Sequence, residues 1–304
     1  NAISFVGNEA DGSFDSDEYF LFYANGPHRI EQAGPELHHV FNHYSDTSFY
    51  FIHVNPSEAP KRIMNQAQSS NVPTNIVTTF NDYTFNESER LNFWESGREW
   101  YGDRYNSLND SYTYTFSVPN ITTDSIKLVT KVASRSVTSC NFTISTSGVS
   151  EIISLGAIPP SSYEYATLGS STIQFENAPS TISVGVNYGH SGSFTAEGFM
   201  DVLELNVRRN LVMVGSNMKF QDIQTVGIGE TSEFQLTNAA QVTEIWDITN
   251  HHNISSIDFT DMTSTKTFVA NTDSLRQFVA ITDNVGKIPV SYGQVINQNL
   301  HALG

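Results

Sequence analysis

The chain has 304 residues, of which 32 are acidic and 15 are basic, so its formal net charge is -17. This charge predicts no nucleic-acid partner, because phosphate contacts need a basic surface, and we interpret the acidity as surface solubility, with calcium binding as the alternative. The single cysteine, Cys140, excludes an intrachain disulfide, and no apolar run reaches the ~18 residues of a membrane span, so no transmembrane segment is predicted.

The first distinctive segment is the acidic loop at residues 7–18. With Gly12 at the sixth position of an EF-hand-type calcium loop, Asp11, Asp15 and Glu18 fall at the fifth, ninth and twelfth positions. Gly7 then takes the first position, where a strong ligand belongs, and strand-like residues flank the loop. The sequence therefore favours a turn in which Gly12 supplies a positive φ, and it keeps Asp11, Asp15 and Glu18 as a candidate calcium site.

Three histidines follow between two dense apolar runs. Residues 20–23 and 49–52 are typical of strands covered on both faces. Zinc needs several ligands that face one another. On a strand, His38 and His39 point to opposite faces, while His39 and His43 share one. We interpret the three histidines as surface or half-buried side chains rather than metal ligands.

Alternating apolar and polar residues dominate the middle of the chain. In residues 111–118, for example, Tyr112 and Tyr114 share an apolar face, which predicts a half-buried strand. Helical signal is scarce: a weak capping box at residues 86–96 predicts at most one short helix or turn. The pattern predicts an all-β chain of several antiparallel β-sandwich modules, with a central jelly-roll-like sandwich.

The length favours two or three domains. The polar, aperiodic residues 66–75 predict a linker. We divide the chain into an N-terminal β module at residues 1–75, the jelly-roll-like sandwich at 76–210 and a further β module at 211–304. The alternative is that residues 1–75 pair with 211–290, which makes the sandwich an insertion.

Neither the cysteine nor the aromatic residues form a catalytic signature. Cys140 lies at the start of a predicted strand and is interpreted as a core or edge residue, because a nucleophilic thiol needs a lowered pKa and a nearby histidine. Trp94, Trp100, Tyr101 and Tyr105, together with Tyr112 and Tyr114, are candidates for a carbohydrate-stacking platform, although the alternation at Tyr112 and Tyr114 favours the core. No cofactor is predicted apart from the candidate calcium ion.

Several stretches, in order along the chain, resemble the N-terminal region of PorU-type sortases, which are gingipain-like cysteine peptidases of the type IX secretion system of Bacteroidetes. No single stretch is a catalytic signature, and it is their joint order that is specific. They are residues 11–23, 42–52, Ser-Gly-Arg-Glu-Trp-Tyr-Gly at 96–102, 204–209 with 218–220, Ile-Trp-Asp-Ile-Thr at 245–249, and Asn-Gln-Asn-Leu-His at 297–301.

The resemblance implies an exported protein at the outer membrane or cell surface. The family removes C-terminal secretion signals from cargo and joins cargo to an anionic lipopolysaccharide. Its catalytic cysteine and histidine have no matching positions here, so the resemblance implies a non-catalytic region whose catalytic domain follows residue 304. Implied partners are that domain, secreted cargo and secretion components. Arg135 departs from the family pattern and receives no role. The alternative function is a free-standing carbohydrate-binding or adhesin-like protein.

Overall fold

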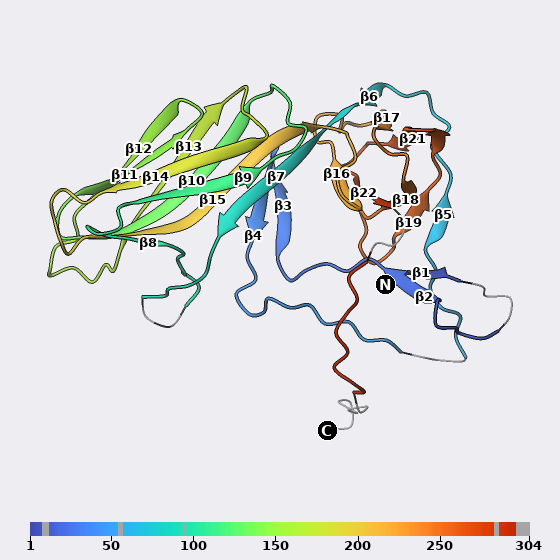
Figure 1. Cartoon of the computed structure of the whole chain (residues 1–304), viewed down its shortest axis with the longest axis horizontal. Helices are drawn as coiled ribbons and strands as arrows, with labels where there is room; N and C mark the ends of the chain where they lie inside the picture. The colour runs from blue at the N-terminus through green and yellow to red at the C-terminus, as the bar shows by residue number, and fades with distance from the viewer. Residues whose placement is uncertain (8–11, 54–56, 94, 96, 283–285, 296–304) are drawn as a thin grey trace.

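A computed structural model describes residues 1–7, 12–53, 57–93, 95, 97–282 and 286–295. These residues form strands, turns and loops and contain no helix, which confirms the predicted all-β fold class. Figure 1 shows two sandwiches side by side along the long axis, with two small hairpins beneath them. In this described part, no helix is long and apolar enough to cross a membrane.

The first sandwich is the predicted jelly roll. One sheet has the order β13-β10-β15-β7, with β8 also paired to β15, and the other has the order β12-β11-β14-β9. In chain order, leaving aside the short β8, each strand lies in the opposite sheet from the strand before it, except that β12 follows β11 in the same sheet. This is the connectivity of a jelly roll. The strands are β7 (Thr79–Glu87), β8 (Arg104–Tyr105), β9 (Ser111–Ser117), β10 (Ile126–Arg135), β11 (Cys140–Thr146), β12 (Val149–Leu155), β13 (Thr167–Phe175), β14 (Thr181–Gly189) and β15 (Glu197–Asn210).

Period-two alternation builds the core of the jelly roll. On β9, Tyr114 and Phe116 are buried while their neighbours Thr113, Thr115 and Ser117 are exposed. Since successive strand residues point to opposite faces, each sheet turns one apolar face inward. The outer face of the β7–β15 sheet is mixed: Tyr83 and Phe85 lie on it together with Glu87, Glu204 and Asn206, and it carries the candidate site described below.

The second sandwich combines strands from both sides of the jelly roll in the sequence. Its sheets have the orders β16-β22-β18-β19-β5 and β20-β21-β17-β6. Both β5 and β6 precede the jelly roll, and they pair in parallel with β19 and β17, which follow it. The strands are β5 (Met64–Gln66), β6 (Asn75–Val77), β16 (Asn217–Gln221), β17 (Thr231–Leu236), β18 (Val242–Asp247), β19 (Ser255–Ile257), β20 (Thr260–Met262), β21 (Thr265–Asn271) and β22 (Gln277–Thr282).

Four phenylalanines form the centre of the second core. Phe234 stacks on Phe268 with ring centroids 5.0 Å apart, and the rings of Phe220 and Phe278 pack around them. The segment at 66–75, which the sequence predicted as a linker, is bonded along this sandwich: Ser69 donates its N–H to the Val269 carbonyl, and Thr74 donates its N–H to the Thr231 carbonyl. The division into three domains stays a prediction.

Two hairpins complete the fold. The hairpin of β1 (Ile3–Val6) and β2 (Tyr19–Phe22) lies below the second sandwich, and the hairpin of β3 (Arg29–Ala33) and β4 (Glu36–Val40) lies against β7 of the jelly roll (Figure 1).

Of the short helix or turn considered at residues 86–96, the helix is wrong for the described part of that segment, which contains strand, bridge and turn residues. Asn86 is a residue of β7 and pairs with Leu203 of β15, so it has a sheet partner instead of capping a helix. Farther on, Leu91 forms a bridge with Tyr101. Tertiary pairing thus overrides a weak local capping signal.

Candidate functional site

The β3–β4 hairpin is fixed to the jelly roll by partly buried polar contacts. The Nδ1 atom of His38 lies 3.0 Å from Oε2 of Glu204, and the backbone N–H of His39 donates to Oε1 of the same carboxylate at 2.5 Å. Asn206 accepts the N–H of Leu37 and donates back to the Leu37 carbonyl. One face of β15 therefore holds the backbone of β4.

His39 is the most buried of the three predicted histidines. Its side chain is 3% exposed, its Nδ1 atom bonds to Glu87, and its ring stacks on Phe85 with centroids 3.8 Å apart. The expectation of a surface or half-buried position fits all three: His43 is exposed, and His38 and His39 are half-buried as residues, although the ring of His39 is almost fully covered. Its ring is buried because β4 lies across the outer face of β7, a contact that strand alternation alone does not reveal.

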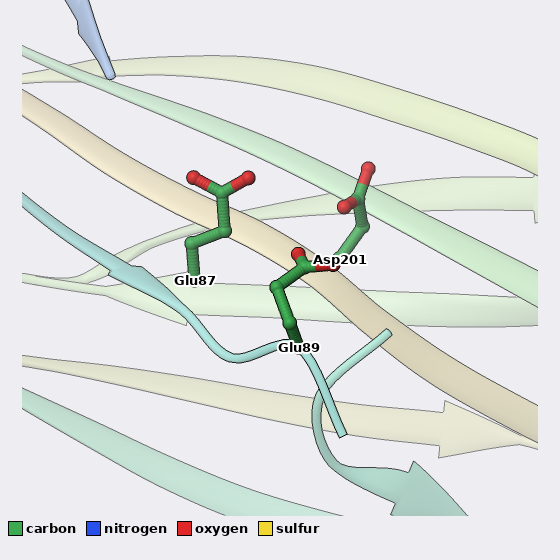
Figure 2. A group of neighbouring side chains, drawn as sticks. All are labelled: Glu87, Glu89 and Asp201. Atoms are coloured by element: carbon green, nitrogen blue, oxygen red, sulfur yellow. The ribbon is translucent and has the colours of Figure 1, made fainter. Parts of the chain in front are cut away.

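Beside this hairpin, three carboxylates converge. Glu87 is the last residue of β7, Glu89 follows two residues later, and Asp201 lies on β15. One oxygen from each lies within 4.8 Å of the others. Figure 2 shows the three side chains gathered where β7 ends alongside β15. They meet because Glu87 pairs with Val202, the neighbour of Asp201, in the antiparallel register of the two strands.

Burial and mutual repulsion make two of these groups weak acids. Burial, together with the charges of Glu87 and Asp201, raises the pKa of Glu89 to about 7. Burial also raises the pKa of Asp201 to about 6; Lys131 opposes this shift, and Glu87 adds to it. Oε2 of Glu89 is buried without a hydrogen-bond partner. The cluster can therefore hold protons near neutral pH, and its oxygens are of the type that binds hard cations.

The sequence did not single out this cluster. The acidic residue types are common in this chain, and Glu87 and Asp201 are far apart in it. A signal was present only in the pairing of β7 with β15, the first and last strands of the jelly roll in chain order.

The predicted calcium loop is only partly described. Asp11 lies outside the described residues. Asp15 and Glu18 form a turn, in which Oε2 of Glu18 accepts the Asp15 N–H at 2.9 Å and the Asp15 carbonyl accepts the Glu18 N–H at 3.2 Å. One Glu18 oxygen is therefore engaged with the backbone of its own loop. The calcium site at Asp11, Asp15 and Glu18 stays a prediction.

An apolar groove of about 1320 Å³ lies between the β1–β2 hairpin and the second sandwich. Consecutive residues of β2, a stretch at 58–62 and β16, β18 and β22 of the sandwich line it. Its aromatic walls include Phe20, Phe22, Tyr23, Tyr50 and Trp246. We call this feature the β2 groove.

The described cysteine and aromatic candidates are mainly core residues. Cys140 is buried in the jelly roll, and its thiol donates to the Thr138 carbonyl at 3.3 Å, which confirms its interpretation as a packing residue. Tyr101, Tyr105 and Tyr114 are also buried. They do not offer the exposed ring faces that carbohydrate stacking needs. Trp94 lies outside the described residues.

No model of a known protein family and no curated protein matches the sequence. In structure, the chain is similar to a crystal structure of dimeric latent PorU from Porphyromonas gingivalis, with a TM-score of 0.76 and 18% sequence identity. The match covers 94% of this chain but 28% of that PorU chain. At this identity, the similarity establishes a shared fold.

Proposed function

We propose that this chain is the non-catalytic scaffold and recognition region of a larger, cell-surface cysteine peptidase of the PorU type. The proposal is supported by the shared fold over 94% of this chain, together with the ordered sequence resemblance. The resemblance implies that the whole protein removes C-terminal secretion signals from exported cargo at the outer membrane. In this proposal, the peptidase chemistry belongs to a catalytic domain that this region positions.

The observation that carries the positioning role is an exposed apolar surface formed by two separate segments. Residues 49–52 and 286–295 have no regular secondary structure. Phe49 and Tyr292 bring them together, with ring centroids 5.6 Å apart. Around this contact Phe51 is 80% exposed and Ile288 is 94% exposed. Exposed apolar side chains that lie together, as Phe49 and Tyr292 do, mark an interaction surface in a soluble protein.

We propose that the catalytic domain of the same protein packs against this surface. Residues 288–301 include Pro289 and lack the glycine and serine richness of flexible linkers. A short, stiff connection keeps two domains close, and interfaces between domains of one chain commonly bury apolar surface.

Chymotrypsin, which cleaves after aromatic residues, tests this role on the whole protein. In the present chain, we expect fast cleavage after Phe51 and Tyr292. In the full-length gene product both sites become protected, whereas Tyr163, which is fully exposed on the jelly roll, remains cleavable and serves as the internal control. Equal cleavage after Phe51 and Tyr292 in both proteins would contradict the docking role.

A further inference from the structure

We propose that the β2 groove binds an extended peptide whose apolar and acidic side chains alternate, and that this peptide pairs with the free edge of β2. This inference deepens the proposed recognition role. It rests on that role in one respect, because the role is the reason for taking a peptide as the partner. The residues that carry it belong to β2, to the stretch at 58–62 and to β16.

Strand β2 is an edge strand. It pairs antiparallel with β1 from Tyr19 to Phe22. The edge of β1 that faces away from β2 is bridged to the segment around Arg62: Ile3 donates its N–H to the Lys61 carbonyl, and its carbonyl accepts the N–H of Ile63. Within the described part of the chain, β1 is the one strand that shares backbone hydrogen bonds with β2. One edge of β2 therefore offers backbone donors and acceptors to an added strand.

This free edge faces the groove. Residues 19–23 all line it without a break. Because successive side chains of a strand point to opposite faces, a cavity above one face contacts every second residue, and a cavity along the edge contacts them all. The groove therefore runs along the backbone of β2, where an added strand would lie.

The walls of the groove suit apolar side chains. Phe20 is 46% exposed, and Phe22 packs on Tyr50 with ring centroids 5.3 Å apart. Trp246 and Ile281 of the second sandwich form the opposite side. At about 1320 Å³ the groove exceeds the usual range for small-molecule sites, roughly 300–1,000 Å³, and has room for several residues of a peptide.

The charge around the groove is opposite to that of the whole protein. Among the described residues, four basic residues and two acidic residues, Glu18 and Glu58, line it, which gives these side chains a formal charge of 4 − 2 = +2 in a chain of net charge -17. Lys219 lies over the ring of Tyr23, 5.0 Å from its centroid, and Lys287 is exposed at the rim. Because opposite charges attract, this basic lining favours an acidic partner. The basic residues are Lys61, Arg62, Lys219 and Lys287.

Fluorescence anisotropy with the present chain tests the proposal. The probe is a labelled peptide of about six residues, the usual length of a strand, in which valine and phenylalanine alternate with glutamate. We expect saturable binding that weakens at least about tenfold in the Lys219→Glu, Lys287→Glu double variant, equivalent to about 1.4 kcal/mol. The double variant Arg98→Glu, Arg135→Glu makes the same charge change at two exposed positions outside the groove and should bind like wild type.

Two altered probes separate the contributions of charge and backbone. A peptide with lysine in place of glutamate should not bind, because it repels the basic rim. A peptide N-methylated at alternate residues should also fail, because it cannot pair with β2. Equal binding of either peptide, or no binding of the original probe, overturns the proposal.

Other occupants give distinct results. Self-association of the chain in sedimentation that the Lys219→Glu, Lys287→Glu variant abolishes, or binding to anionic phosphatidylglycerol vesicles with no peptide binding, also overturns it. Failure here is distinguishable from failure of the proposed docking role, because protection of Phe51 and Tyr292 in the full-length protein is measured without any peptide.

Discussion

Arg208 and Asp222 form a buried ion pair at the junction of the two sandwiches. Arg208 is on β15 of the jelly roll, and Asp222 directly follows β16 of the second sandwich. Nη1 of Arg208 lies 2.8 Å from Oδ1 of Asp222 and 2.9 Å from Oδ1 of Asn81 on β7. The two charged side chains are 9% and 2% exposed. The junction is therefore a packed interface between the two sandwiches.

Removing Asp222 takes away the buried partner of the Arg208 charge and leaves Asp124, 3.7 Å away and 54% exposed, as its remaining carboxylate. We therefore expect Asp222→Ala to lower the free energy of unfolding by about 3–5 kcal/mol. Urea denaturation measures the loss, and Asp17→Ala, an exposed carboxylate on the N-terminal loop, is the control with an expected change within about 0.5 kcal/mol. A loss no greater than that of the control would show that the pair does not stabilise the junction.

The acidic cluster should make the protein less stable as the pH rises. Because the pKa of Glu89 is raised from 4.5 to about 7, the folded state holds more protons than the unfolded state between these values, and the free energy of unfolding falls across that window. Asp201, with its pKa raised from 3.8 to about 6, acts in the same direction.

Glu89→Gln keeps the side chain at position 89 neutral at every pH. The variant therefore lacks the part of the fall in the free energy of unfolding at high pH that Glu89 causes. Thermal denaturation should show a higher Tm than wild type at pH 8 and a similar Tm at pH 4. The control is Glu176→Gln, an exposed residue on the jelly roll, which should leave the Tm unchanged at both pH values. A variant that is less stable than wild type at pH 8 would mean that the Glu89 carboxylate is stabilised there, for example by a cation.

The sequence predicts those features of the fold that depend on a local pattern of residues, and it does not predict pairings between distant segments. The strands of the jelly roll follow from alternation such as that of Tyr114 and Phe116, because a strand with one buried face must alternate. The parallel pairings of β5 and β6 involve three residues each and join distant segments, so no local pattern specifies them. The cluster of Glu87, Glu89 and Asp201 depends on strand register in the same way.

The loop at residues 7–18 should behave as a turn. The Asp15 and Glu18 contacts already satisfy backbone amides, and Gly7 offers no carboxylate at the first ligand position. Calorimetric titration with calcium should therefore give the same weak heats for wild type and Asp15→Ala. Micromolar binding that is lost in Asp15→Ala would establish the calcium site instead.

The chain should have no peptidase activity of its own. Cys140 is 4% exposed within the jelly-roll core, where a substrate carbonyl has no access to its thiol. Peptides with arginyl, lysyl and secretion-signal cleavage sites should all remain intact on incubation with the protein. Turnover that Cys140→Ala abolishes would assign catalysis to this region and refute the prediction.

Hydrogen exchange tests the positioning role most directly. The rates of individual amides are compared between the present chain and the full-length gene product under identical conditions. If the region from residue 211 to 304 positions a catalytic domain, amides within it, above all those of residues 286–295, exchange more slowly in the full-length protein. Amides on the distant strands β11 and β12 keep their rates and serve as the internal reference. If no amide between residues 211 and 304 gains protection, this module is a spacer and the positioning role is wrong.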